Sequence, residues 1–145
     1  MTEDLKNRAV RLLARREHSR IELARKLAPH GTPQEIQAVL QQLEQSGLLS
    51  DARYAESFVR AKGSRFGALK LRHELRARGV AEELIAAALL PDGDNEQDRA
   101  CEVWRRKFGS PPRDAAEYAR QARFLQNRGF AAEVIRRVLK SGDSQ

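Results

Sequence analysis

The sequence predicts an all-α protein of three tandem three-helix repeats in an elongated, curved array, and two observations lead to this prediction. The first is an internal repeat, in which a set of residues near the middle of the chain returns 50 positions later. The second is that no segment is rich in β-branched residues and alternates between apolar and polar residues with period two, so no strand is predicted. Short helical units that recur at a fixed period bury their apolar faces by stacking on their neighbours.

The internal repeat covers the end of one helix and the start of the next. A helix with apolar periodicity ends at Arg78-Gly79, and its copy ends at Arg128-Gly129. Glycine closes a helix in the left-handed conformation without steric cost. The identical pairs at this offset are Leu75/Leu125, Arg78/Arg128, Gly79/Gly129, Ala81/Ala131, Glu83/Glu133, Ile85/Ile135 and Leu89/Leu139. A fainter copy, 48 positions upstream of Leu75, Gly79, Glu83 and Leu84, consists of Leu27, Gly31, Glu35 and Ile36. These alignments predict repeats at residues 1–48, 49–91 and 92–145.

Local start and stop signals predict the helices of the first repeat. Thr2 caps a helix that runs to about Arg16. Ser19 and Glu22 have the spacing of a capping box, so a second helix begins at Ser19 and ends at Pro29 and Gly31. Thr32-Pro33-Gln34-Glu35 has the same spacing with proline at the first helical position, and the helix that it opens stops at Gly47.

The remaining helices follow from similar signals. In the second repeat, Ser50-Asp51 opens a helix to Lys62, and helices over 68–78 and 81–90 precede a linker at 91–95. In the third repeat, one helix ends at Phe108-Gly109, Asp114 caps a helix to Arg128, and the last helix spans 131–140. The large apolar side chains expected in the core are those of Tyr54, Phe58, Leu71, Leu75, Trp104, Phe108 and Leu125.

Composition limits the classes of function. The 145 residues include 27 basic and 20 acidic side chains, a net charge of +7, so we expect a polyanion or an acidic protein surface as a partner. No window reaches the roughly 20 apolar residues of a membrane span and the N-terminus has no signal segment, so we expect a cytoplasmic protein without a membrane contact. The single cysteine, Cys101, excludes an internal disulfide and predicts a small apolar filler.

No constellation of residues indicates an enzyme. His18, His30 and His73 are not spaced to pair on one helix, and no cysteine set accompanies them, so no metal site is predicted. No glycine-rich phosphate loop is present. Asp51 and Glu56 are better explained as partners of a helix dipole than as catalytic carboxylates. We therefore expect no catalytic residue and no cofactor, and we look for binding instead.

Basic residues recur on the polar faces of successive helices. Residues 51–80 hold eight lysines and arginines against three acids, whereas residues 81–100 hold one against six. Arg120 and Arg123, and Arg136 and Lys140, are further pairs on one helix face. If the repeats stack in register, these side chains form a continuous basic surface. The binding residues that we predict are Arg53, Arg60, Lys62, Arg65, Lys70, Arg72 and Arg76 in the middle repeat, supported by Arg8, Arg11 and Arg15.

Several runs of residues resemble the bacterial RecX regulatory proteins. The runs are Ala9-Val-Arg-Leu-Leu-Ala-Arg-Arg-Glu-His-Ser19 with Glu22-Leu23 and Lys26-Leu27, Gly47-Leu-Leu-Ser-Asp51 with Arg53-Tyr54, Gly67 with Glu74-Leu75 and Arg78-Gly79-Val80, and, more loosely, Arg106-Lys107-Phe108-Gly109 and Phe124-Leu125 with Arg128-Gly129-Phe130. Ser50 departs from the family, which usually has a second acid beside Asp51, but serine also caps a helix.

The resemblance implies a modulator of the RecA recombinase that lies along the RecA–DNA filament. Such a protein restrains the ATPase, strand-exchange and co-protease activities of RecA, and thereby recombinational DNA repair and the SOS response. The family also binds DNA directly, so single- and double-stranded DNA are expected as weak partners without sequence specificity, and a monomer is expected.

Two other functions remain open on the sequence. A direct DNA-binding protein of the helix-turn-helix type would place the same basic helices on phosphates, although no long apolar dimerisation helix is evident. A helical-repeat adaptor would instead use its alanine-rich faces on another protein. The RecA interpretation differs from both because it requires the recombinase to be present.

Overall fold

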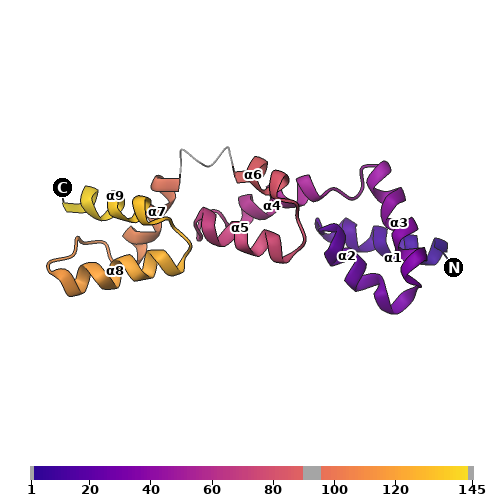
Figure 1. Ribbon diagram of the computed structural model, residues 1–145, viewed down its shortest axis with the longest axis horizontal. Coiled ribbons are helices and arrows are strands. Elements are labelled where there is room, and N and C mark those ends of the chain that lie inside the picture. The colour runs from indigo at the N-terminus through magenta and orange to yellow at the C-terminus, as the bar shows by residue number, and fades with distance from the viewer. Residues whose placement is uncertain (1, 90–95, 144–145) are drawn as a thin grey trace. The chain divides into compact units, whose positions relative to one another are not determined.

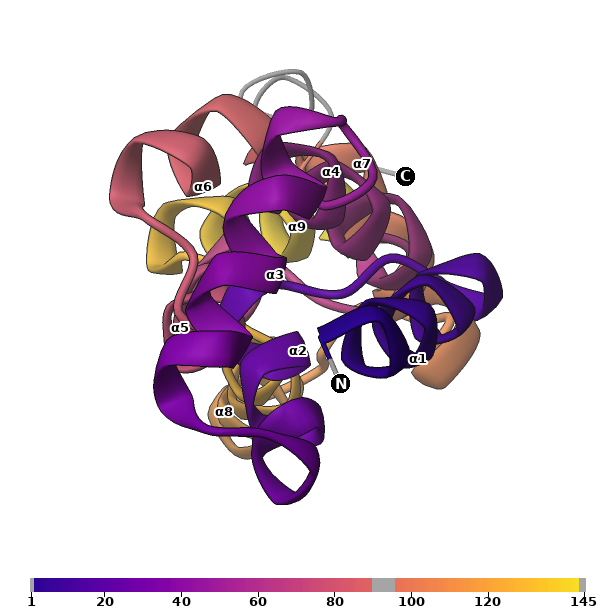
Figure 2. The same ribbon diagram turned by 90° about the vertical axis from the view of Figure 1, so that its right-hand side faces the viewer.

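The computed structural model describes residues 2–89 and 96–143, and every regular element within these ranges is helical (Figures 1 and 2). The predicted all-α class is therefore confirmed for this part of the chain. The predicted linker at 91–95 lies outside the described residues. The elements are α1 Thr2–Arg15, α2 Arg20–Leu27, a 3₁₀ turn η1 Ala28–His30, α3 Pro33–Gln45, α4 Asp51–Lys62, α5 Ala68–Ala77, α6 Glu82–Leu89, α7 Glu96–Lys107, α8 Ala115–Asn127 and α9 Ala132–Asp143.

The helices belong to two compact units that do not follow the sequence repeats. The first unit combines Met1–Ser57 with Leu75–Ile85, and the second combines Phe58–Glu74 with Ala86–Gln145. The repeat formed by α4, α5 and α6 is thus divided between them. In particular, the Arg78-Gly79 turn packs with the repeat that precedes its own.

In the first unit, α1, α2 and α3 lie together (Figure 1), and a core made mainly of leucines is buried among them. Leu23, Leu27, Leu40 and Leu43 are completely buried. Capping boxes begin two of these helices, as the sequence predicts: the side chains of Ser19 and Thr32 each accept a hydrogen bond from the backbone N–H three residues later. Local capping therefore sets where α2 and α3 start, and apolar periodicity sets which faces they bury.

In the second unit, α7, α8 and α9 form another core, centred on Trp104, Leu125 and Phe130. The Trp104 indole N–H donates to the buried Gln121 amide oxygen at 2.8 Å, so the polar edge of this large ring is satisfied. Asp114 caps α8, as predicted. Phe108, predicted to be core, is only half-buried, because its ring packs edge-to-face on Phe124 at the margin of the core.

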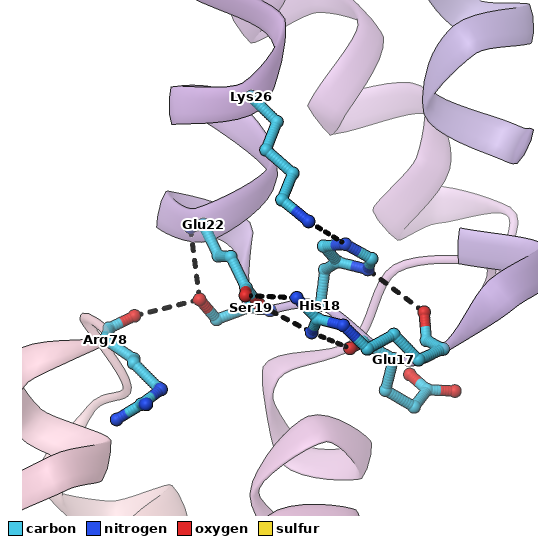
Figure 3. Close-up of polar contacts among 7 residues, drawn as sticks. Glu17, His18, Ser19, Glu22, Lys26 and Arg78 are labelled. Atoms are coloured by element: carbon cyan, nitrogen blue, oxygen red, sulfur yellow. Dashed lines mark hydrogen bonds and ion pairs between the residues drawn. The ribbon is translucent and has the colours of Figure 1, made fainter. Parts of the chain in front are cut away.

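The first turn of α2 is bonded to residues of the following repeat (Figure 3). Ser19, which is completely buried, accepts from Glu22 N–H, and its hydroxyl donates to the Arg78 carbonyl at 2.9 Å. The next donor, Arg20 N–H, donates to the Asp51 carboxylate at 2.7 Å. Asp51, expected only to complement its own helix dipole, is therefore also an acceptor for a neighbouring helix.

The start of α5 in the second unit has an equivalent arrangement. Gly67 N–H donates to the Arg128 carbonyl at 2.7 Å, and Leu69 N–H donates to the Gly129 carbonyl at 3.1 Å. Between them, Ala68 N–H donates to the Glu96 carboxylate at 3.1 Å. In both units, an Arg-Gly turn and a carboxylate from the following repeat thus supply acceptors to the start of a second helix. We call each such set of contacts a repeat joint.

The glycines of the two Arg-Gly turns have the predicted left-handed backbone, with φ of 80° at Gly79 and 91° at Gly129. The fainter copy does not share this geometry. Gly31 has an extended φ of −167°, because Pro29 lies in the 3₁₀ turn that separates α2 from α3 and the chain leaves that turn extended. The predicted equivalence of Gly31 and Gly79 is therefore wrong at the level of conformation. The first helix, α1, begins at Thr2.

His18 lies beside the first repeat joint and is 1% exposed. Its Nε2 is 3.1 Å from Lys26 Nζ (Figure 3), and its Nδ1 is 3.0 Å from the Arg16 carbonyl. Because the lysine ammonium can only donate, these partners assign the proton to Nδ1 and leave Nε2 as the acceptor. Burial lowers the pKa of His18, and the positive charges of Arg16 and Lys26 lower it further against the opposing effect of the Arg16 carbonyl.

The glycine geometry predicts a graded set of stability losses on substitution by alanine. Gly47→Ala, with φ of 82° and open space around it, should lose only the cost of a left-handed residue, about 1–2 kcal/mol. Gly129→Ala should lose more, since its methyl would lie 2.6 Å from the backbone nitrogen of Lys70. Gly79→Ala should fall between them, because its methyl overlaps the flexible end of Ile21. Urea unfolding followed by circular dichroism and Trp104 fluorescence measures the order, and equal losses at Gly47 and Gly129 would contradict the second joint.

The environment of His18 predicts that stability falls as the pH drops below about 6.5. A histidine whose folded pKa is lowered binds its proton more readily in the unfolded chain, so stability is complete above the unfolded pKa of 6.5 and declines towards the folded pKa. One proton contributes at most about 1.4 kcal/mol per pH unit. His18→Gln, which cannot titrate, should flatten this dependence. Urea midpoints at pH 7.5, 6.5 and 5.5 test this, and parallel curves for the two proteins would show that His18 is not the responsible group.

Candidate nucleic-acid and partner interface

The three arginines of α1 are all exposed and share one helix face in the first unit. Arg8, Arg11 and Arg15 follow at i, i+3 and i+7, and Arg11 Nε donates to the Asn7 carbonyl at 3.4 Å. Because all three side chains are exposed on one face, an anionic partner can reach them together. A shallow hollow of about 200 Å³ beside Arg8 contains Asp4 and Glu35 as well, so its charge is mixed.

Two of the predicted binding residues, Arg53 and Arg76, form ion pairs within the first unit. Arg53 Nε is 2.7 Å from a Glu17 carboxylate oxygen, and its Nη2 donates to the Leu48 carbonyl at 3.0 Å. Arg76 Nε is 2.7 Å from Glu82, and this hydrogen bond raises the pKa of Arg76. Exposed pairs of this kind contribute little to stability, because solvent screens them. They do offset the arginine charges, however, so both residues offer less to an anionic partner than the sequence indicates.

The other five predicted residues belong to the second unit. Arg60 is exposed and Arg72 is half-buried. Lys62 Nζ lies 5.9 Å from the centre of the Phe58 ring. Arg65 lies in the connection between α4 and α5, and Lys70 lies in α5. Both contact the ring of Phe66, so the structure brings these two predicted residues together.

Three cations surround Phe66. Lys70 Nζ lies 4.4 Å from the ring centre, and the guanidinium carbons of Arg65 and Arg128 lie 5.7 Å and 5.6 Å from it. A cation over an aromatic face is attracted by the ring quadrupole. Arg128 also lies 5.1 Å from the centre of the Phe124 ring and donates to the Arg65 carbonyl at 3.4 Å. The arginine of the docked Arg-Gly turn therefore connects two aromatic rings.

An open pocket of about 280 Å³ adjoins this cluster. We call it the basic–aromatic pocket, and its lining residues are Ser64, Arg65, Val103, Arg106, Lys107, Phe124 and Arg128. Lys107 Nζ lies 5.5 Å from the centre of the Phe124 ring. Glu102 lies outside the lining and is 3.6 Å from Arg106. Four cations and one aromatic ring thus face a pocket whose described lining contains no acid.

The sequence prediction missed most of this pocket. Arg65 was predicted, but Arg106, Lys107, Arg128 and Phe124 were not assigned to binding. Two signals could have indicated them: Arg128 repeats Arg78 at an offset of 50, and each of Phe66 and Phe124 directly follows an arginine in the sequence. Interleaved aromatic and basic residues are typical of single-stranded nucleic-acid sites.

A smaller set of cations surrounds the first repeat joint. Arg25, Lys26 and Arg78 line a groove of about 440 Å³ together with Glu22 and Ala77. Burial raises the pKa of Glu22, but Arg16, which bonds its carboxylate at 2.7 Å, and Ser19 N–H outweigh burial and lower it overall. The ionised Glu22 makes this groove a poorer anion site than the pocket of the second unit.

The part of the chain that the structure describes holds no group of three His, Cys, Asp or Glu side chains arranged for a metal ion. Cys101 is half-buried against the core of the second unit, and burial raises the pKa of its thiol. Within 2–89 and 96–143, no helix has the length and apolarity to cross a bilayer.

Known proteins with similar sequences place the chain in one family. Models of the first, second and third three-helix domains of RecX match residues 6–43, 50–89 and 94–139. The regulatory protein RecX of Leptothrix cholodnii is 51% identical over 142 residues, which cover 97% of this chain and 90% of that protein. The regulatory protein RecX of Chromobacterium violaceum is 48% identical over 141 residues, with 97% and 91% covered.

The fold has a counterpart in a crystal structure of RecX from Lactobacillus salivarius, which matches with a TM-score of 0.86 at 20% identity and covers 99% of this chain and 97% of that one. At this identity the match concerns the fold alone. The three tandem domain models and the full-length relatives show that the chain belongs to the RecX family of regulatory proteins.

Proposed function

We propose that this protein regulates the RecA recombinase by binding the RecA–DNA filament. It restrains the ATPase, strand exchange and co-protease activities of RecA and so modulates recombinational DNA repair and the SOS response. Membership of the RecX family over nearly the whole chain is the observation that carries this proposal. In this role the protein acts in the cytoplasm as a monomer, by binding rather than by catalysis, and needs no cofactor.

The exposed basic side chains suit a filament that presents phosphates and acidic protein surface. A helix of about 12–14 residues is about 18–21 Å long, so a protein of several such helices can contact more than one filament subunit. Bound across neighbouring subunits, it opposes the subunit rotations that couple ATP turnover to strand exchange. Among the predicted contacts we favour the exposed Arg8, Arg11, Arg15, Arg60 and Arg65, because the charges of Arg53 and Arg76 are offset by ion pairs.

Direct binding of DNA without the recombinase is a second candidate function, and the basic–aromatic pocket favours it. In such binding, cationic side chains neutralise DNA phosphates. For a tenfold rise in salt concentration, the logarithm of the association constant therefore falls by about 0.9 for each duplex phosphate that is contacted. The two functions differ in whether RecA must be present.

Reversing charges on the second unit should weaken inhibition of the recombinase. We expect the wild-type protein to inhibit the DNA-dependent ATPase of its cognate RecA at well below one molecule per recombinase, with single-stranded DNA saturating. The double variant Arg60→Glu/Arg65→Glu should need about tenfold more protein for the same inhibition, because two favourable charge contacts become repulsive. The matched control Arg113→Glu/Arg137→Glu changes two exposed charges of the same unit that lie outside the predicted basic surface.

Inhibition by Arg60→Glu/Arg65→Glu equal to that of the control would remove this basic face from the proposal. Failure of the wild-type protein to inhibit, with DNA binding intact, would contradict the RecA proposal and favour the second candidate.

A further inference from the structure

The basic–aromatic pocket combines charge and an aromatic surface, unlike the hollow beside Arg8 and the groove at the first joint. The hollow beside Arg8 includes Asp4 and Glu35, and the groove at the first joint includes Glu22. The basic–aromatic pocket has four cations and the ring of Phe124. A ligand that matches this lining carries more than one negative charge and also a planar, apolar group.

The size of the pocket narrows the class of ligand. At about 280 Å³ it is near the lower end of small-molecule sites, which hold about 300–1,000 Å³. A helix of a partner protein is about 10–12 Å across and does not enter such a space. An extended acidic peptide would satisfy the cations but would leave the ring without a matching surface. A nucleotide unit has both parts, because a planar base lies between charged phosphates.

The cations are held around the rings before any ligand arrives. Arg128 lies within 5.6 Å of both the Phe66 and Phe124 ring centres, and Lys107 lies 5.5 Å from Phe124. These contacts restrict the rotamers of long side chains, so less conformational entropy is lost on binding. A base can stack on an aromatic ring or on the plane of a guanidinium group, while the charges engage the backbone.

We propose that the basic–aromatic pocket binds one nucleotide of a single-stranded nucleic acid, with its base against Phe124 and Arg128 and its flanking phosphates against Arg106 and Lys107. In a duplex the bases are stacked on one another and do not present a face to such a pocket, so the site selects single strands. The base is held by stacking, which every base permits, so recognition is independent of sequence. This inference extends the DNA contact of the proposed function, but it does not require the recombinase.

The test is the binding of labelled oligonucleotides in the absence of RecA. Fluorescence anisotropy measures the affinity of a twelve-nucleotide oligothymidylate and of an abasic strand with the same number of phosphates. Arg106→Gln/Lys107→Gln removes two pocket charges, and the control variant Arg113→Gln/Arg137→Gln removes two exposed charges elsewhere in the same unit. Phe124→Leu keeps an apolar side chain but removes the ring. Far-UV circular dichroism establishes that each variant is folded.

We expect the wild-type protein to bind oligothymidylate at least about fivefold more tightly than the abasic strand. This ratio is the lower end of the gain in affinity that one base makes by stacking on an aromatic ring. Phe124→Leu should remove this preference. Arg106→Gln/Lys107→Gln should weaken oligothymidylate binding about tenfold, and the control variant should weaken it clearly less.

Three results would overturn the proposal. Equal wild-type affinity for the thymidylate and abasic strands would exclude stacking. Equal losses of oligothymidylate affinity in Arg106→Gln/Lys107→Gln and in the control variant would mean that binding depends on net charge alone. Pocket-dependent binding of a hexaglutamate peptide, with oligothymidylate binding unchanged, would assign the pocket to an acidic protein segment. None of these results depends on the ATPase measurement, so this inference and the RecA proposal can fail separately.

Discussion

The amide groups at the start of each second helix need acceptors, and the rest of the structure depends on where these acceptors come from. The first turn of a helix has no internal partners for its N–H groups. In α2 and α5 the following repeat supplies acceptors, through the carboxylates of Asp51 and Glu96. The Arg-Gly turns supply further acceptors. The Arg128 and Gly129 carbonyls accept from amides at the start of α5, and the Arg78 carbonyl accepts from the Ser19 hydroxyl at the start of α2. The corresponding helix of the third repeat, α8, begins instead with a cap from its own Asp114. Neighbouring repeats are thus joined by polar contacts at the start of a helix as well as by apolar ones.

This constraint explains why the Arg-Gly pair recurs and why it matters for binding. The backbone must turn left-handed and approach the neighbouring helix closely, and a methyl group at Gly129 would meet the backbone of Lys70. The same turn carries Arg128 into contact with Phe66 and Phe124. The contact that joins the repeats therefore also positions a cation of the basic–aromatic pocket.

Features set by neighbouring residues could be predicted from the sequence, and features set by distant ones could not. The caps at Ser19, Thr32 and Asp114 and the left-handed Gly79 and Gly129 depend on a few adjacent residues, and all were predicted. The extended Gly31 was not, because a 3₁₀ turn at Pro29 intervenes.

The same rule holds for the candidate site. The exposure of Arg8, Arg11 and Arg15 follows from helical periodicity. The ion pair of Arg53 with Glu17 joins residues 36 positions apart, so no local pattern indicates that this charge is offset. The hydrogen bond from Arg128 to the Arg65 carbonyl spans 63 positions, and only the packed second unit brings the pocket residues together.

The measurement that tests the central claim most directly is amide hydrogen exchange at Gly67 and Leu69, the donors of the second joint. Neither amide has an acceptor within its own helix, so any protection comes from the docked Arg-Gly turn. The structure predicts that both exchange as slowly as the amides inside α8, and that Gly129→Ala accelerates both while leaving the capped start of α3 unchanged. Exchange of Gly67 and Leu69 at the rate of an unstructured chain in the wild-type protein would contradict the account.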